Sequence, residues 1–346
     1  MRLQLLDHTY PWWGKHAGFR LLGPSLAMQG CLATVTMPRN NIAARAIGKA
    51  FSTWNGFCRR DQKLAAAEFE FLMKMRISGT KGHILYIEDH LALLSRPGVA
   101  ERWVGTINLP RRSWKPEQLA LLRSARSAIV LCDRQRQEFS DLIPESRIQF
   151  VRYGVDSSFF RPKSESRGDR LPRLIFVGAW LRNTTMLSRL IPRVLDRFPK
   201  VVFDFVVPRF ARKDPALQSL LGHHAIRWYE GLSDEALLGL YHNATAMLLP
   251  MQDSGANNAV VEALACGLPV ITTDTGGIRS YGGADIFPVI PNNDDDACLD
   301  LVEQYLTQHD FRRNIGDACR RYAVDQLDWK QVAKEYITAY KFLGLV

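Results

Sequence analysis

The chain has 346 residues, 47% of them hydrophobic, which is enough chain and enough apolar material for two domains of ordinary size. No apolar run reaches the roughly 20 residues of a membrane-spanning helix, and the short, charged start does not have the pattern of a signal peptide. Six scattered cysteines without a Cys-x-x-Cys pair argue against a zinc site and indicate reduced thiols in a cytosolic setting.

The net charge of +10 is distributed unevenly. Residues 1–160 contain 23 Lys and Arg against 13 Asp and Glu, whereas residues 161–346 contain 22 of each. A basic half favours nucleic acid, anionic lipid or a phosphorylated acceptor as a partner, or it serves only to keep the protein in solution. The sequence has no aromatic and basic motif typical of nucleic-acid binding, so we expect no nucleic-acid partner.

Strands and helices alternate through the first half, as in a doubly wound α/β sheet. We expect strands at residues 2–6, 84–87, 104–108, 127–132 and 148–151. We expect helices at residues 19–29, 41–57, 62–76, 119–126 and 134–142. In open sheets of this kind, ligands bind at the carboxyl ends of the strands. His90 and Asn108 follow two of these strands and are therefore candidate site residues.

The loop between the first strand and the first helix contains the candidates Gly14, Lys15, His16 and Gly18. Doubly wound sheets bind ligands at this loop. It lacks a Gly-x-Gly-x-x-Gly fingerprint, so a purely structural turn remains an open alternative.

The helix at residues 41–57 is amphipathic. At 100° per residue its aromatic and aliphatic side chains fall on one half of the wheel, and Arg45, Lys49 and Ser52 fall on the other. This pattern is typical of a helix that docks on an anionic membrane. The alternative is a helix that packs its apolar side on the first sheet.

The second half begins again as an α/β unit after a polar segment at residues 163–172, which has the composition of a linker. We expect strands at residues 173–178, 201–207, 225–228, 246–249 and 268–273. We expect helices at residues 186–197, 234–241, 259–266, 299–305, 311–322 and 328–336.

The stretch from Asp253 to Gly277 is a polar loop, a short apolar helix, a buried strand and a glycine turn. The amides and the dipole at the start of this helix form a natural seat for phosphate. Glu262 lies one turn inside the helix, where a buried carboxylate is costly unless it is hydrogen-bonded. A sugar or ribose diol is a suitable partner. The alternative is that Glu262 faces solvent.

The run Glu262-Ala-Leu-Ala-Cys-Gly-Leu-Pro269 resembles the donor-site signature of retaining GT-B glycosyltransferases of family 4. The resemblance implies two Rossmann-like domains that face a cleft, and it implies that Glu262 binds the nucleotide ribose. The family's first acid contacts the donor sugar, but Ser254 stands at its position here. We therefore expect Asp253 to take that role, with Gly255 in the same loop and Asn257 or Asn258 at the helix start.

Two further stretches resemble the same family. Tyr153 to Pro162 resembles its hinge region, and Asp328 to Tyr336 resembles its terminal helix. The resemblance therefore divides the chain into an acceptor-side domain at residues 1–160, a nucleotide-sugar domain at 161–325, and a terminal helix at 326–346 that crosses back to the first domain.

The resemblance also implies cations for the diphosphate in the loop after the first strand of the second domain. Ala179 stands where the family has Arg, and Arg182 fits the second cationic position. Arg209 or Arg212 supplies the missing charge, or both are surface residues.

Other positions follow from the resemblance in the same way. The backbone from Tyr229 through Gly231 to Leu232 is expected to frame the base, and the loop of Gly14, Lys15 and Gly18 approaches the donor phosphate. Asn108 stands where the family commonly has a catalytic His, and Asn does not exchange protons as His does. His16 and His90 are the alternatives for that role.

The sequence therefore predicts a retaining, metal-independent hexosyltransferase. It would use a nucleotide sugar as co-substrate, without a cofactor, and a glycan or lipid-linked acceptor of cell-surface polysaccharide or lipopolysaccharide synthesis. We expect it in the cytoplasm or at the inner membrane face. A non-catalytic scaffold of the same fold and a sugar-nucleotide epimerase remain alternatives, and the sequence names neither the sugar nor the nucleotide.

Overall fold

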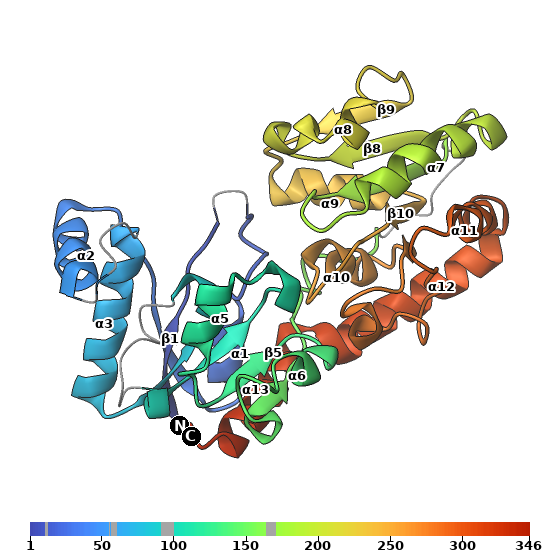
Figure 1. Ribbon diagram of the computed structural model, residues 1–346. Helices are drawn as coiled ribbons and strands as arrows, with labels where there is room; N and C mark the ends of the chain where they lie inside the picture. The colour runs from blue at the N-terminus through green and yellow to red at the C-terminus, as the bar shows by residue number, and fades with distance from the viewer. Residues whose placement is uncertain (11–12, 55, 57–60, 91–99, 164–170) are drawn as a thin grey trace. The chain divides into compact units, whose positions relative to one another are not determined.

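The computed structural model in Figure 1 describes residues 1–10, 13–54, 56, 61–90, 100–163 and 171–346. Pro11, Trp12, Phe57 and most of the expected linker lie outside these residues. The chain forms two compact units. Unit 1 contains residues 1–13, 18–153 and 329–346, and unit 2 contains residues 14–17 and 154–328.

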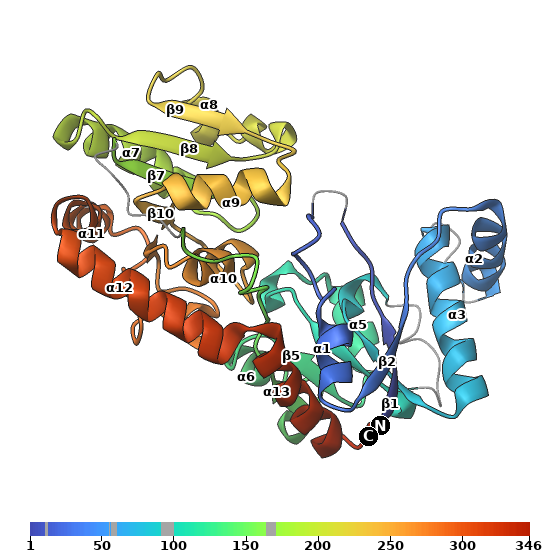
Figure 2. The ribbon, with the colours of Figure 1, turned by 180° about the vertical axis from the view of Figure 1, so that it is seen from behind.

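Unit 1 is built on a six-stranded sheet in the order β2-β1-β3-β4-β5-β6, and every pairing in it is parallel. The strands are β1 (Arg2–Leu6), β2 (Leu32–Thr36), β3 (Lys81–Ile84), β4 (Trp103–Ile107), β5 (Ala128–Val130) and β6 (Ile148–Phe150). Both faces are covered by helices, as an all-parallel sheet requires (Figures 1 and 2).

The helices of unit 1 are α1 (Leu22–Met28), α2 (Ile42–Trp54), α3 (Gln62–Ser78), α5 (Pro116–Leu122), α6 (Arg134–Glu138) and α13 (Trp329–Phe342). Phe71 of α3, Leu122 of α5 and Phe139, which directly follows α6, share one core cluster with Trp103 and Ile107 of the sheet. α13 covers a different part of the sheet, and its Tyr340 hydroxyl lies 2.7 Å from Nδ1 of His83 on β3.

Two expectations for unit 1 were wrong. The strand expected at residues 84–87 lies at Lys81–Ile84, and Ile87–Asp89 forms a 3-10 turn. The polar residues Lys81 and His83 made this strand hard to predict. His83 is nevertheless completely buried, because Tyr340 and Thr106 form hydrogen bonds with its two ring nitrogens. Strand β2 was missed because it is a largely exposed edge strand without a clear alternation of apolar residues.

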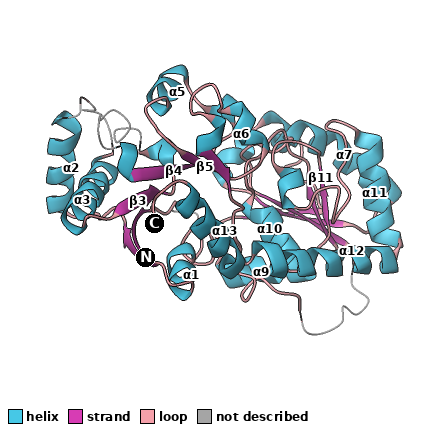
Figure 3. Cartoon of the chain, turned by 90° about the horizontal axis from the view of Figure 1, so that it is seen from below, coloured by secondary structure: helices cyan, strands magenta, loops and turns pink. Residues whose placement is uncertain are grey.

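Unit 2 is built on a five-stranded parallel sheet in the order β11-β10-β7-β8-β9. The strands are β7 (Arg173–Val177), β8 (Val202–Val206), β9 (Ile226–Tyr229), β10 (Ala246–Leu249) and β11 (Val270–Thr272). The helices are α7 (Thr184–Arg197), α8 (Pro215–Gln218), α9 (Asp234–Asn243), α10 (Asn258–Ala265), α11 (Asp295–Thr307) and α12 (His309–Tyr322). Figure 3 shows helices around the strands of each unit.

The direction of strand order in unit 2 reverses between β7 and β10, which is where open α/β sheets bind their ligands. The loops that follow these two strands are joined by backbone hydrogen bonds. The amide of Gln252 donates to the carbonyl of Leu181 at 2.9 Å, and the amide of Asn183 donates to the carbonyl of Pro250 at 2.8 Å. These loops carry the predicted donor-site residues. The expected α/β fold with two Rossmann-like units is therefore confirmed.

Among the helices of the described chain, none has the length and apolar composition that a membrane span requires.

Candidate functional site

The start of α10 lies at the carboxyl edge of the unit 2 sheet. Asn257 caps the helix: its side chain accepts a hydrogen bond from the amide of Val260 at 3.4 Å. Asn258 is the first helical residue and is half-buried, while Gly255 in the preceding loop is buried. The positive end of the helix dipole therefore lies beside a loop of small residues, which is an arrangement that suits an anion.

The guanidinium of Arg182 lies beside this helix start. Its Nη2 donates to Oδ1 of Asn257 at 3.4 Å, and its Nε donates to the carbonyl of Val177 at 3.0 Å. The loop bends sharply at Leu181, which has a φ of 58°. Burial lowers the pKa of Arg182 to about 10, so the side chain remains charged at neutral pH. The structure thus brings Arg182 and Asn257 together, as the sequence predicts.

The glycine turn after β11 packs against the loop before α10. Gly276 has a φ of +57°, and a Cβ added to it would lie 2.3 Å from the backbone nitrogen and oxygen of Ser254. The amide of Gly277 donates to the carbonyl of Ser254 at 2.6 Å. Asp253 accepts a hydrogen bond from the amide of Ser254 at 2.9 Å. Close backbone packing therefore fixes the loop that carries Asp253, and it requires glycine at 276.

Glu262 lies inside α10 and is 6% exposed, so the alternative that it faces solvent is wrong. Its Oε2 accepts a hydrogen bond from the hydroxyl of Tyr241 on α9 at 2.8 Å. Burial raises the pKa of Glu262 to about 8 because an ionised carboxylate loses its hydration there. A ligand that donates hydrogen bonds to this carboxylate would favour its ionised form.

The structure separates the two arginines that were alternatives for the second cation. Arg212 donates to the carbonyls of Val207 and Tyr229 at 3.0 and 3.1 Å, and it lies over the ring of Trp228. It therefore holds the β8 and β9 loops together. The side chain of Arg209 is 83% exposed and is ion-paired with Glu230. These features are those of a surface residue.

At the expected base pocket, the hydroxyl of Tyr229 donates to Asp204 of β8 at 3.2 Å, so this side chain bonds to the neighbouring strand. Gly231 follows with a φ of +60°, in a backbone conformation that favours glycine.

Residues Gly14–Ala17 belong to unit 2. The amides of Lys15 and His16 donate to Asp234, the first residue of α9, at 2.6 and 3.3 Å. A Cβ on Gly14 would lie 1.5 Å from Oδ1 of the same carboxylate, so a side chain at this position would displace the carboxylate of Asp234. Gly18, with a φ of +77°, belongs to unit 1. Asp234 is not among the predicted site residues, although an acid after the cap residue Ser233 marks a helix start.

His16 is held in a defined orientation. Its Nδ1 lies 2.6 Å from Oδ2 of Asp156, and its ring stacks on Phe159 with centroids 3.7 Å apart. A carboxylate on Nδ1 orients the imidazole ring and fixes which of its nitrogens remains available to a ligand. Asp156 stood within the hinge-like motif, but its pairing with residue 16 is a tertiary contact that the motif does not reveal.

The other two predicted catalytic residues lie in unit 1. His90 is fully buried, with its Nδ1 at 2.8 Å from Oε1 of the equally buried Glu68. The side-chain amide of Asn108 donates to the carbonyl of Leu85 at 2.9 Å and to Oε2 of Glu88 at 3.4 Å. Burial raises the pKa of Glu88 to about 8.

A polar cluster that the sequence analysis missed lies near Asn108, after β1 and β3. Oδ2 of Asp89 lies 3.1 Å from Nε2 of His8 and accepts from the hydroxyl of Tyr10 at 2.6 Å. The strand order of unit 1 reverses between β1 and β3, so the cluster lies at the ligand-binding edge of that sheet. His8 and Tyr10 follow shortly after the first strand, and that position could have marked them as candidate site residues.

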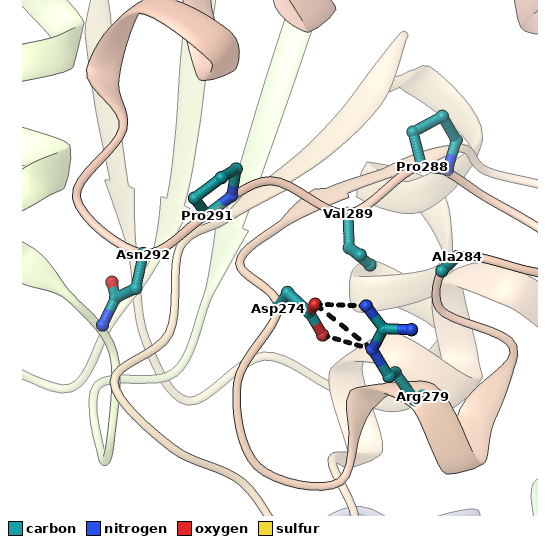
Figure 4. Close-up of a pocket in the computed structure, with 7 residues that line it drawn as sticks. All are labelled: Asp274, Arg279, Ala284, Pro288, Val289, Pro291 and Asn292. Carbon is teal, nitrogen blue, oxygen red and sulfur yellow. Dashed lines mark hydrogen bonds and ion pairs between the residues drawn. The ribbon is translucent and has the colours of Figure 1, made fainter.

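Figure 4 shows an open pocket of about 630 Å³ beside β11. Asp274 lies in its lining, held by Arg279 through bonds of 2.9 Å from Nε and 2.6 Å from Nη2. The other lining residues are Ala284, Pro288, Val289, Pro291 and Asn292. None of the predicted donor-site residues lines this pocket.

Known proteins resemble this chain in both sequence and fold. Residues 171–308, all in unit 2, match the family described as glycosyl transferases group 1. The MMP alpha-(1->4)-mannosyltransferase of Mycolicibacterium hassiacum is 24% identical over 252 residues, which is 71% of this chain and 59% of that protein. The O-antigen chain mannosyltransferase B of Escherichia coli is 31% identical over 118 residues, which is 34% of this chain and 30% of that protein. The chain thus spans less than two thirds of the length of these relatives.

Two solved structures have the same fold over nearly the whole chain. Sucrose-phosphate synthase from Thermosynechococcus elongatus superposes with a TM-score of 0.72 at 15% identity and covers 99% of both chains. Anabaena HepE in complex with UDP-glucose superposes with a TM-score of 0.70 at 11% identity and covers 100% of both. Residues 171–308 of the chain thus match the group 1 glycosyltransferase family, and both units have the GT-B fold of these structures.

Proposed function

We propose that the chain is a retaining glycosyltransferase that moves a hexosyl group from a nucleotide sugar to a glycan or lipid-linked acceptor. One observation carries the proposal: the start of α10, Arg182 and the buried carboxylate of Glu262 lie together at the switch point of the unit 2 sheet. The names of the two mannosyltransferase relatives support hexosyl transfer, and the UDP-glucose bound to HepE supports a nucleotide sugar.

Each part of the donor has a proposed partner in unit 2. Glu262 accepts hydrogen bonds from the ribose hydroxyls in place of the one from Tyr241. The amides at the start of α10 and the guanidinium of Arg182 bind the diphosphate. Asp253 contacts the donor sugar from the loop fixed by Gly276.

The proposed chemistry places little demand on a protein base. The bond between the anomeric carbon and the phosphate oxygen breaks, and the acceptor oxygen bonds to the same face of that carbon. The leaving phosphate takes the acceptor's proton. Because Asn108 has no exchangeable proton of suitable pKa, this route does not depend on it.

The leaving diphosphate requires positive charge in the transition state. The positive end of α10 and the charged Arg182 supply it in our proposal, which makes the reaction independent of a metal ion. Turnover should therefore be unchanged after dialysis against EDTA. A loss of activity that magnesium or manganese restores would contradict metal independence without affecting the assignment of the donor site.

Unit 1 is the proposed acceptor side, with the cluster around Asp89 at the edge of its sheet. The proposed setting is cell-surface polysaccharide or lipopolysaccharide synthesis at the cytoplasmic face of a membrane. An anionic membrane surface is the partner proposed for residues 41–57.

The test is release of free nucleotide from a panel of UDP-, GDP- and ADP-sugars. We expect one donor to be hydrolysed slowly by the wild type and not by Glu262→Ala. Asp253→Asn should lower turnover and spare nucleotide affinity, whereas Ser254→Ala should do little. If the wild type binds nucleotide but cleaves none of the donors, even with acceptor extracts, the non-catalytic scaffold is the correct reading. Release of a changed sugar would identify an epimerase.

A further inference from the structure

Helix α2 lies outside the helical layer that covers the sheet of unit 1. α3 lies against β1, β2 and β3, and α2 packs on α3 (Figures 1 and 2). The contact is close because of Gly48: a Cβ there would lie 1.7 Å from the backbone oxygen of Gln62. Phe51 of α2 also meets Phe69 of α3, with ring centroids 5.6 Å apart. α3 therefore occupies the place against the sheet, and α2 is left with a side that faces solvent.

That solvent-facing side is mostly apolar, and its exposed Thr53 has its hydroxyl bonded back to the carbonyl of Lys49 at 2.9 Å. Ile42 is 87% exposed, Ile47 is 44% exposed and Trp54 is 72% exposed. The α2 apolar face consists of these residues and three exposed alanines, Ala43, Ala46 and Ala50. At 100° per residue the six positions fall within an arc of about 140°, and Arg45 and Lys49 lie at one edge of it. A helix that only completes the core would bury this face.

The charge of the chain segment that carries α2 has one sign. Between Asp7 and Asp61 the chain contains seven Lys or Arg and no acidic residue. Arg45 and Lys49 are exposed on α2 itself, and the Arg45 guanidinium donates to the side chain of Asn40 at 2.8 Å. A second copy of this chain would bring like charges together at the face. An anionic lipid surface is complementary to both the apolar and the basic parts.

We infer that α2 docks the protein on an anionic lipid bilayer, with the α2 apolar face at the boundary between head groups and acyl chains. A helix of 13 residues is about 20 Å long, too short to span the roughly 30 Å hydrocarbon core, so α2 lies in the plane of the interface. The inference rests on the proposed function only for its purpose, since a lipid-linked acceptor lies at such a surface. The surface itself is a property of unit 1.

Flotation with liposomes, with and without anionic phospholipid, tests the electrostatic part. Wild type should float with the anionic vesicles only, and less at high salt because exposed charges are screened. Each basic residue near an anionic surface strengthens binding about fivefold. Arg45→Glu with Lys49→Glu should therefore weaken partitioning at least about 25-fold. Lys200→Glu with Lys213→Glu, an equal change at exposed positions of unit 2, should float like the wild type.

A matched pair of isoleucines tests the apolar part. Ile42 on α2 and Ile77 on α3 are 87% and 80% exposed, so replacing either should leave the fold intact. Ile42→Ser should weaken flotation about tenfold, and Ile77→Ser should not change it. Trp54 fluorescence should shift to the blue with anionic vesicles in a variant that retains Trp54 and has its other tryptophans replaced by Phe.

Three outcomes would overturn the inference. In the first, the wild type stays at the bottom of the gradient with anionic vesicles. In the second, the variant Arg45→Glu with Lys49→Glu floats as well as the wild type. In the third, the protein is a dimer in solution and Ile42→Ser dissociates it. Nucleotide affinity of the charge-reversed variant, measured without vesicles, should equal that of the wild type. Failure at the membrane is thus distinguishable from failure of the donor site.

Discussion

The carboxyl group of Glu262 must lose its proton before both of its oxygens can accept hydrogen bonds from a ribose. Its pKa of about 8 in the ligand-free protein means that it is mostly protonated at pH 6. The affinity for a ligand that prefers the ionised form increases as the pH rises towards that pKa. Above the pKa, the affinity changes little. The donor site is therefore sensitive to pH through a residue that is almost inaccessible to solvent.

Glu262→Ala should weaken nucleotide binding about ten- to a hundredfold at pH 8, because ribose loses a charged acceptor that contributes roughly 1.5–3 kcal/mol. In the wild type, affinity should rise by roughly tenfold or more between pH 6 and pH 8, and in Glu262→Gln it should be flat. Calorimetric titrations at several pH values measure both effects. Wild-type affinity that does not respond to pH, together with unchanged affinity of Glu262→Ala, would remove Glu262 from the site.

Arg182→Ala should weaken binding of a nucleoside diphosphate more than binding of the monophosphate, because its guanidinium is assigned to the phosphate farther from the ribose. A charge-assisted hydrogen bond contributes about 1.5–3 kcal/mol, so we expect a ten- to hundredfold loss for the diphosphate. Arg189→Ala on α7, whose guanidinium is ion-paired with Asp295 outside the predicted site, is the control. Equal losses for both nucleotides would place Arg182 elsewhere.

At the scale of elements, the donor site depends on how the turn after β11 supports the loop before α10. The loop and the turn together fix the position of the helix start. The amide of Gly277 donates a hydrogen bond to the carbonyl of Ser254, and the backbone of Gly276 packs closely against the backbone of Ser254. A substitution in the turn should therefore act on ligand binding through the loop.

Gly276→Ala tests this support. Gly222 is the matched control, because it has a similarly positive φ of +81° but no atom within 4 Å of the position of a Cβ. Both substitutions carry the penalty of about 1–2 kcal/mol for a left-handed alanine. Only Gly276→Ala adds a collision with backbone, which costs a further 1–3 kcal/mol or so. We expect a lower melting temperature and lost nucleotide affinity for Gly276→Ala alone. Equal effects of the two would show that only backbone conformation matters.

At the scale of the whole molecule, each unit buries a glutamate whose pKa is raised at the ligand-binding edge of its sheet. Burial raises the pKa of both Glu88 in unit 1 and Glu262 in unit 2 to about 8 from the ordinary value of 4.5. Between these values the unfolded chain has released protons that the folded protein retains. Stability contributed by these two groups therefore falls as the pH rises from about 4.5 to 8, and it is constant above.

Glu88→Gln and Glu262→Gln should each flatten this decline. One pKa unit corresponds to about 1.4 kcal/mol, so each substitution should relieve a few kcal/mol at pH 8 and little at pH 4.5. Thermal unfolding of the wild type and both variants at pH 5 and pH 8 measures the difference. A glutamine variant that is destabilised equally at both pH values would show that the carboxyl serves only as a hydrogen-bonding group.

Local signals in the sequence determined much of unit 2. Ser233 caps α9 and Asn257 caps α10, and Gly267 with Pro269 follows the end of α10; such signals are local, because they act within one turn of the chain. The alternation of strands and helices determined the doubly wound class, and the spacing from Glu262 to Pro269 pointed to the family. The signals weakened in unit 1, where β2 is largely exposed and β3 contains the buried His83.

Only the tertiary structure decided which side chains are buried and what they bond. Tyr241 of α9 donates a hydrogen bond to Glu262, and Asp234 accepts hydrogen bonds from the amides of Lys15 and His16. Arg212 donates to the carbonyls of two loops. The wheel of α2 showed an apolar side, but α3 decided that this side remains exposed. Caps and periodicity depend on neighbours along the chain. Burial and hydrogen-bond partners depend on residues brought together by folding, and a single sequence does not state those distances.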